Sequence, residues 1–176
     1  MFGHLTILFK NWHWPALSIA ASIFMLAMAH GFERFAMLAP CPLCLRQRDV
    51  YWTIIAVAAL ILIMLRLRPR NLAVILGNTT LGIIFLTGAF IAGQHVGVEW
   101  GLWPAPSGCS AGAVDITNLD LGNLDQRQAT ASCTEIAWQF LGLSMAGWNM
   151  IASLLLSGFS FCAAIYNLRN GASLQR

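Results

Sequence analysis

Long apolar runs alternate with short polar segments along the 176-residue chain. Four of these runs are close to the roughly 20 apolar residues that a transmembrane helix needs. The pattern predicts an all-α membrane protein, a four-transmembrane-helix bundle that forms one integral membrane domain over residues 1–176. The predicted spans cover residues 15–32, 50–67, 72–93 and 145–168, the second being extended by Arg66, which can snorkel to the interface.

Composition supports this assignment. Hydrophobic residues make up 58% of the chain, above the roughly 45 to 50% of soluble domains, and only 10% of the residues are charged. The first run has an alternative interpretation as a signal peptide, because Lys10 precedes it and Ala27-Met28-Ala29 resembles a cleavage site. Its length favours a transmembrane span, because the run continues past that site.

Small residues and tryptophans add detail to the predicted helices. Small side chains allow close helix packing in lipid, and the third run contains Gly77, Gly82, Thr87 and Gly88. Tryptophans favour the membrane interface, and those near predicted span ends are residues 12, 14, 52, 100, 103 and 148. We expect this group to anchor the spans at the interface.

The distribution of charge predicts the orientation. Six basic residues lie in short segments without acidic residues on one side, whereas four lie on the other side with all seven Asp and Glu residues. Positive charges near span ends favour the cytoplasm. We therefore expect both termini in the cytoplasm of a bacterial inner membrane, with periplasmic loops over residues 33–49 and 94–144. Basic residues scattered in this way do not favour nucleic-acid binding.

Four of the five cysteines fall in these two outer loops, namely Cys41, Cys44, Cys109 and Cys133. An even number of cysteines in an oxidising compartment predicts two disulfides. The fifth, Cys162, lies within the fourth span, where we expect a small buried apolar residue.

The sequence Cys41-Pro42-Leu43-Cys44 has three interpretations. A structural disulfide would close a very small loop and remove little chain entropy. A zinc site would need a second pair at the same short spacing, which Cys109 and Cys133 lack. A redox site is favoured, because Cys44 lies at the start of the second span, where the helix dipole stabilises a thiolate. Arg48, four residues later, would lie on the same helix face.

A redox disulfide in a membrane needs an electron acceptor. The sequence contains no glycine-rich dinucleotide motif, haem attachment motif or iron–sulfur spacing. A lipophilic carrier is the remaining economical choice. Quinone fits, because its reduction takes two electrons and two protons, which matches one dithiol.

Together these features resemble the DsbB family of bacterial disulfide-bond-formation proteins. The resemblance rests on Cys41-Pro42-Leu43-Cys44 followed by Arg48, on Cys109 and Cys133 in a long outer loop, and on the stretch "SCTEIAWQFLGLSMAGW" that leads into the fourth span. It covers about residues 30 to 168.

The resemblance implies a quinone-dependent protein-disulfide oxidoreductase that keeps the periplasm oxidising. A reduced DsbA-like thioredoxin-fold partner would attack a Cys109–Cys133 disulfide, with Cys109 forming the mixed disulfide. The resulting dithiol would be reoxidised by Cys41–Cys44, and Cys44 would pass electrons to ubiquinone or menaquinone. The resemblance also implies that Arg48 and His95 lie near the quinone.

Some alternatives stay open at this point. A membrane thiol reductase similar to vitamin K epoxide reductases would share the bundle, although its active pair usually comes late in the chain. A nonenzymatic metal-binding membrane protein is the other alternative. His30 and Glu33 are candidates for proton transfer or for simple interface solvation. The stretch "VDITNLDLGNL" corresponds loosely to a membrane-lying helix in the family, but its apolar positions fit no single period.

Overall fold

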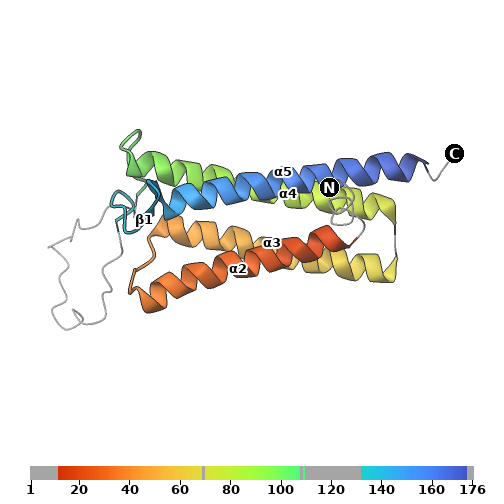
Figure 1. Ribbon diagram of the computed structural model, residues 1–176, viewed down its shortest axis with the longest axis horizontal. Coiled ribbons are helices and arrows are strands. Elements are labelled where there is room, and N and C mark those ends of the chain that lie inside the picture. Colours follow the sequence, from red (N-terminus) through yellow and green to blue (C-terminus); the bar gives the residue numbers. More distant parts are fainter. Residues whose placement is uncertain (1–11, 69, 108, 110–131, 174–176) are drawn as a thin grey trace.

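The computed structural model describes residues 12–68, 70–107, 109 and 132–173. Four long helices run side by side in an antiparallel bundle (Figure 1). Each helix is long and apolar enough to cross a membrane, so the predicted fold class is confirmed. The helices are α2 (His13–Phe35), α3 (Pro42–Leu67), α4 (Asn71–Glu99) and α5 (Met145–Ser173).

The helices extend beyond the predicted spans at one end of the bundle. Helix α3 begins at Pro42, eight residues before the predicted start at residue 50. Helix α4 continues to Glu99 and therefore includes His95. The polar first turns of α3 are helical because Cys41 is the N-cap residue and Pro42 occupies the first helical position. The segment between α2 and α3 is consequently much shorter than the predicted loop.

Glycines allow α4 to pack closely against its neighbours. A Cβ atom at Gly77 would lie 3.0 Å from the Ile61 side chain, and one at Gly82 would lie 2.9 Å from Phe161. Gly88 is similarly close to Val50, at 3.0 Å. These contacts confirm the predicted role of the glycines. Thr87 is different, because it is exposed and its hydroxyl donates to the Ile83 carbonyl of its own helix.

Helix α2 packs as a full member of the bundle. The Trp14 indole nitrogen donates to the Ser160 hydroxyl of α5 at 2.9 Å, and the Trp14 side chain is buried. Trp14 is therefore not an exposed interface anchor, in contrast to Trp12, Trp52 and Trp100. The burial arises because Trp14 faces α5 across the bundle. The signal-peptide interpretation gains no support from this packing.

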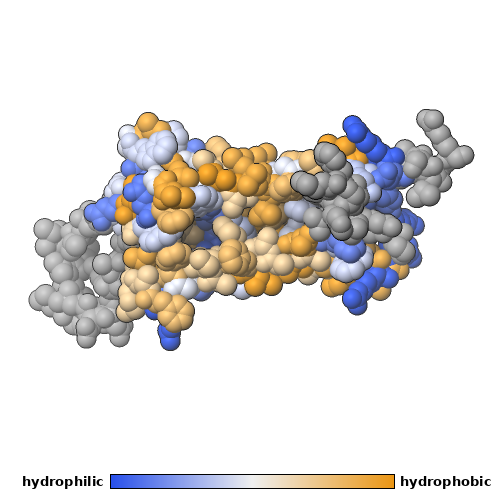
Figure 2. Space-filling model, in the orientation of Figure 1, coloured by the Kyte–Doolittle hydropathy of each residue, from blue (hydrophilic) through white to orange (hydrophobic). Residues whose placement is uncertain are grey.

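The outer surface of the bundle carries an apolar band with polar residues toward both ends (Figure 2). Cys162 lies on this outer surface and is exposed, so the prediction that it is buried was wrong. The next two residues, Ala163 and Ala164, take the inward positions on this turn of α5. The helical repeat thus turns the Cys162 thiol away from the core.

A small hairpin caps the cysteine end of the bundle. Strands β1 (Gln139–Phe140) and β2 (Leu143–Ser144) pair antiparallel, and the turn residues Leu141 and Gly142 have positive φ. A two-residue turn of this kind matches the right-handed twist of paired strands. The apolar pattern did not predict this hairpin, because two-residue strands leave no periodic signal. The hairpin leads directly into α5 (Figure 1).

Candidate redox site

Cys41 and Cys44 form the first turn of α3. Cys41 is the N-cap residue, Pro42 follows at the first helical position, and the backbone N–H of Cys44 donates to the Cys41 sulfur at 3.2 Å. An N-cap side chain commonly accepts such a bond, and proline suits the first helical position because it lacks an N–H. The sequence Cys-Pro-Leu-Cys therefore aims the sulfur of Cys41 at the positive end of the α3 dipole.

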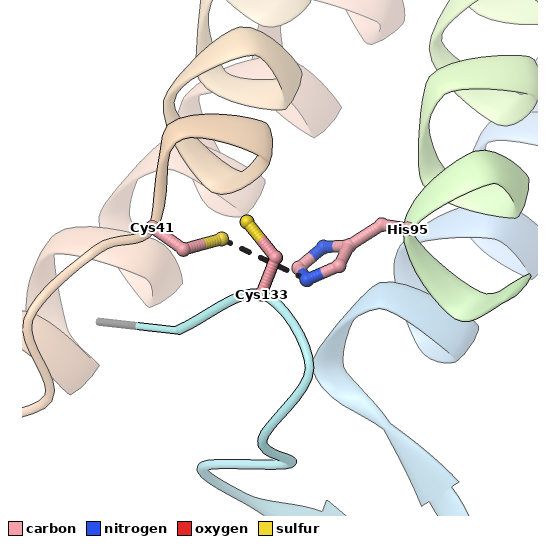
Figure 3. Close-up of side chains that lie close together, drawn as sticks. All are labelled: Cys41, His95 and Cys133. Carbon is pink, nitrogen blue, oxygen red and sulfur yellow. Dashed lines mark hydrogen bonds between the residues drawn. The ribbon is translucent and has the colours of Figure 1, made fainter. Parts of the chain in front are cut away.

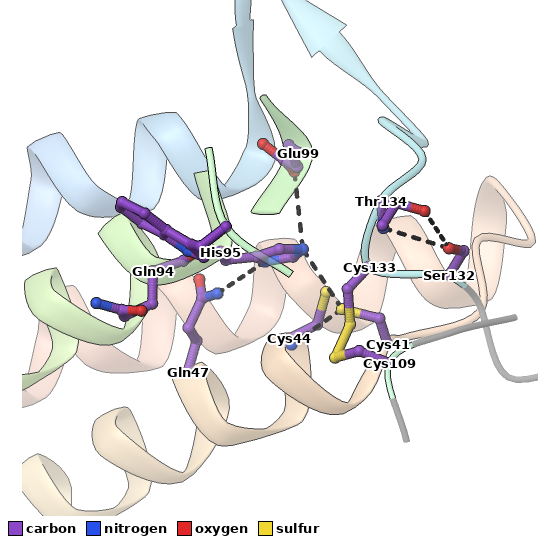
Figure 4. The surroundings of a disulfide bond; sticks show 11 residues. Cys41, Cys44, Gln47, Gln94, His95, Glu99, Cys109, Ser132, Cys133 and Thr134 are labelled. Atoms are coloured by element: carbon purple, nitrogen blue, oxygen red, sulfur yellow. Dashed lines mark hydrogen bonds and ion pairs between the residues drawn. A yellow bond between two sulfur atoms is a disulfide. The ribbon is translucent and has the colours of Figure 1, made fainter. Parts of the chain in front are cut away.

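All four loop cysteines gather at this end of the bundle. Cys41, Cys109 and Cys133 are buried in one small cluster, with Cys44 packed against it. Cys109 and Cys133 form a disulfide, and the Cys133 N–H donates to the Cys109 carbonyl at 3.0 Å. Cys41 and Cys44 are free cysteines, so only one of the two predicted disulfides is formed. The structure thus holds one oxidised and one reduced pair side by side (Figure 4).

The two pairs meet through Cys41 and Cys133. The Cys41 and Cys133 sulfurs and a ring nitrogen of His95 lie within 4.8 Å of one another (Figure 3). A metal would need Cys133 as a thiolate, whereas its sulfur is bonded to Cys109. The arrangement instead suits disulfide exchange, because a thiolate attacks a disulfide sulfur directly.

Several donors converge on the Cys41 sulfur. The Cys44 thiol and the Cys44 backbone N–H donate to it, and His95 Nε2 lies 3.7 Å from it. The hydrogen bond from the Cys44 thiol, followed by those from His95 and the backbone, lowers the pKa of Cys41 to about 4 against the opposing effect of burial. The sequence had pointed to Cys44 as the thiolate. The structure favours Cys41, because the N-cap position collects the donors.

His95 lies on α4, buried between the cysteines and the bundle interior. Its Nε2 is 3.7 Å from the Cys41 sulfur and 3.7 Å from a Glu99 oxygen, and its Nδ1 is 3.1 Å from the Gln47 side-chain nitrogen (Figure 4). The sequence resemblance placed His95 near a cofactor, and the structure brings it into direct contact with Cys41. Glu99 and Gln47 were not singled out from the sequence.

Arg48 lies one helical turn from Cys44, as the spacing predicts, but its guanidinium is held by α2. It donates to Glu33 at 2.5 Å and to the Ala29 carbonyl at 3.2 Å. Glu33 is thus the partner of Arg48 and more than a solvated interface residue. The contact bridges two helices across 15 positions, so no local pattern in the sequence indicates it.

A cavity of about 590 Å³ opens beside the reduced pair. This volume lies within the range of roughly 300 to 1,000 Å³ that is typical of small-molecule sites. Its wall is mostly apolar and aromatic, with residues such as Phe24, Phe32, Trp138, Phe140 and Trp148. Its polar lining includes Cys44, Gln47, Arg48, His95 and Glu33. The cavity can therefore receive a flat apolar molecule with a few polar atoms next to a thiol.

Some residues with predictions at the cysteine end of the bundle lie outside the described residues. The stretch "VDITNLDLGNL", for which the sequence predicts no definite structure, lies outside them. His30 is described, and its Nδ1 is 2.8 Å from the Leu26 carbonyl of its own helix.

Comparisons with known proteins identify similar chains. Residues 11–163 match the family described as "Disulfide bond formation protein DsbB". A disulfide bond formation protein B from Methylococcus capsulatus is 34% identical over 146 residues, covering 77% of this chain and 83% of the relative. A disulfide bond formation protein B from Xylella fastidiosa is 32% identical over 152 residues, covering 80% of this chain and 83% of the relative. A disulfide bond formation protein B 2 from Pseudomonas entomophila is 29% identical over 152 residues, covering 84% and 86%.

Proposed function

The chain belongs to the DsbB family of disulfide bond formation proteins and is a membrane thiol oxidase, and from this premise we propose that it couples the oxidation of a partner dithiol to membrane quinone. The partner is a DsbA-like thioredoxin-fold protein of the bacterial periplasm. The proposed site residues are the four cysteines of the two pairs, with Arg48 and His95 on the quinone side.

The first step concerns the outer pair, Cys109–Cys133. A thiolate of the reduced partner attacks the Cys109 sulfur, which forms a mixed disulfide and releases the Cys133 thiolate. The second thiol of the partner then attacks its own mixed-disulfide sulfur and releases Cys109. The partner leaves as a disulfide, and Cys109 and Cys133 hold its two electrons as thiols. This order follows the general course of thiol–disulfide exchange.

The second step passes the electrons inward, and the proximity of the Cys41 and Cys133 sulfurs, which lie within 4.8 Å of each other, carries this part of the proposal. The Cys133 thiolate attacks an oxidised Cys41–Cys44 pair at Cys41, and Cys44 leaves. Cys109 then attacks Cys133, which restores the outer disulfide and releases Cys41. The lowered pKa of Cys41 favours this release, because a thiol of lower pKa leaves faster. The oxidation state in the structure is the one reached after this transfer.

The residues around the cavity fit a quinone. When bound, a quinone supplies the capacity to take two electrons and two protons, which matches the Cys41–Cys44 dithiol. The aromatic and aliphatic wall suits its ring and tail, while Arg48, Gln47 and His95 provide polar groups for its oxygens. Arg48 is restrained by Glu33 and Ala29, so its positive charge has a defined position beside the cavity.

The proposed orientation places the cysteine end in the periplasm. Acidic residues and all four site cysteines belong to that side of the sequence, whereas Arg66, Arg68 and Arg70 belong to the other. Both termini then lie in the cytoplasm. In the periplasm, disulfides persist and a soluble thioredoxin-fold partner can approach the cysteine end of the bundle.

A membrane assay tests this function. Membranes that contain the protein should oxidise a reduced thioredoxin-fold protein only when quinone is present, and Cys44→Ala should abolish the reaction. Cys162→Ala is the matched control, because Cys162 lies on the outer surface of α5. Equal oxidation without quinone, or full activity of Cys44→Ala, would refute the proposal. Reduction of a partner disulfide by reduced quinone would favour the reductase alternative, and stoichiometric zinc without thiol oxidation would favour the metal-binding alternative.

A further inference from the structure

A buried chain of polar side chains leads from His95 into the bundle. Gln47 contacts His95, Asn149 of α5 donates to Gln47, and the Tyr51 hydroxyl bonds both Asn149 and Ser153. Tyr51 is only 4% exposed and Asn149 only 8%. Polar groups are costly inside an apolar bundle unless they are hydrogen-bonded. This series of hydrogen-bonded side chains therefore needs an explanation beyond packing.

Tyr51, at the far end of this series of side chains, defines the donor-to-acceptor direction of its hydrogen bonds. The Tyr51 hydroxyl donates its single hydrogen to the Asn149 oxygen, so it accepts from Ser153 at 3.1 Å. Among the described residues, Tyr51 is the hydrogen-bond partner of the Ser153 hydroxyl, which agrees with this direction.

The side-chain amides of Asn149 and Gln47 continue the same donor-to-acceptor direction. With its oxygen occupied by Tyr51, Asn149 presents its nitrogen to the Gln47 oxygen. Gln47 in turn presents its nitrogen to His95 Nδ1 at 3.1 Å. An Nδ1 that accepts a hydrogen bond carries no proton, so the proton of a neutral imidazole lies on Nε2.

The near end of the chain leads to the same tautomer. His95 Nε2 faces the Cys41 sulfur and a Glu99 oxygen, each at 3.7 Å. The Glu99 carboxylate and the Cys41 thiolate are both acceptors, and the other Glu99 oxygen already accepts from the Ser144 hydroxyl. An unprotonated Nε2 would point its lone pair at two acceptors. Both ends of the chain therefore require a proton on Nε2.

We propose that Tyr51 and Asn149 are positioning residues that, through Gln47, fix His95 as the Nε2–H tautomer and aim its donor at the Cys41 sulfur. The role in disulfide exchange rests on the proposed function, whereas the tautomer does not. A proton on Nε2 gives the Cys41 sulfur a hydrogen-bond donor. When Cys41 is in a disulfide, Nε2–H still has Glu99 as an acceptor. The same tautomer thus serves both redox states.

Other ionisable groups also face this region. Cys44 and Arg48 approach from α3, Glu99 from α4 and Glu33 from α2, while Cys133 is held in its disulfide. The test must therefore separate a change at His95 from a general change in charge. Substitutions of Tyr51 and Asn149 by uncharged residues do so, because they leave every one of these groups in place.

Nitrogen NMR of the full-length protein labelled with ¹⁵N-histidine tests the tautomer. In the wild type, with His95 assigned by comparison with His95→Gln, Nε2 should carry the proton and Nδ1 should not. Tyr51→Phe and Asn149→Leu should give a mixture of tautomers. Ser157→Ala should not give a mixture. Ser157 is a buried serine on the same helix as Asn149, but its hydroxyl donates to the Gly82 carbonyl and takes no part in this series of hydrogen bonds. Tyr51→Phe removes one hydroxyl only, so it remains informative if Asn149→Leu does not fold.

The pH dependence of Cys41 alkylation, located by peptide mass spectrometry, is the second measurement. Loss of the aimed donor should shift the midpoint for Cys41 upward by about one pH unit, roughly a tenfold fall in thiolate fraction below the midpoint. A proton on Nδ1 in the wild type, or an unchanged tautomer and midpoint in Tyr51→Phe, would overturn the inference. Neither measurement involves a quinone or a partner protein. A failure of the proposed function would therefore leave both expected results unchanged.

Discussion

Removing Arg48 should weaken quinone use more than it weakens folding. In Arg48→Ala, the cavity loses a guanidinium that Glu33 and the Ala29 carbonyl hold in place. Cys41 and Cys44 keep their positions, because their geometry depends on the start of α3. We therefore expect the Cys41–Cys44 disulfide to form normally in this variant.

The size of the effect follows from the contacts of Arg48. A hydrogen bond to a charged group contributes about 1.5 to 3 kcal/mol. Glu33 already neutralises part of the charge, so about 1 to 2 kcal/mol is a reasonable loss, which corresponds to roughly a 5- to 30-fold rise in the quinone KM. The partly exposed ion pair itself contributes little to stability, about 1 kcal/mol or less.

Steady-state kinetics with varied quinone and saturating partner would measure this change. Arg46→Ala is the matched control, since it removes the same charge from an exposed position on the same helix that does not line the cavity. Glu33→Gln keeps an acceptor for Arg48 while removing the negative charge. Equal KM values for Arg48→Ala and Arg46→Ala in well-folded protein would refute the assigned role of Arg48.

Three further predictions concern orientation, partner attack and protonation. A reporter that is active only in the periplasm should work when fused after Pro106 and fail when fused after Arg70; the reverse pattern would contradict the orientation. A reduced partner that lacks its second cysteine should accumulate a covalent complex with the protein through Cys109, visible on nonreducing gels, because the thiol that resolves the mixed disulfide is absent; a link through another cysteine would argue against this order. Alkylation of Cys41 should show a pH midpoint of about 4, because hydrogen bonds lower its pKa and keep the thiolate through neutral pH; a midpoint at the ordinary thiol value would contradict that assignment.

The apolar pattern predicted the bundle well, because each helix must present about 20 apolar residues to the membrane. The same pattern missed the first two turns of α3, which contain Gln47 and two arginines and lower the local hydropathy. A different signal was present there. Cys41 followed by Pro42 is an N-cap followed by a favoured first helical residue.

Side-chain partners across the bundle were less predictable. Spacing placed Arg48 one turn from Cys44, but its ion pair with Glu33 depends on how α2 approaches α3. The bond between Gln47 and Asn149 joins residues 102 positions apart. Contacts of this kind depend on three-dimensional packing and leave no period in the sequence. The exposure of Cys162 did leave a signal, because several polar residues of α5 recur at helical spacing and are all buried, which places Cys162 off the buried face. These residues are Asn149, Ser153, Ser157, Ser160 and Asn167.

The central claim is that electrons pass between the two cysteine pairs through Cys41 and Cys133, and disulfide mapping of two single variants tests it most directly. In Cys44→Ala, Cys41 lacks its neighbour and should be found by mass spectrometry in a disulfide with Cys133, leaving Cys109 as a thiol. In Cys41→Ala, Cys44 should not be linked to Cys133, and the Cys109–Cys133 disulfide should remain. A Cys44–Cys133 link in Cys41→Ala, together with no Cys41–Cys133 link in Cys44→Ala, would contradict the proposed path.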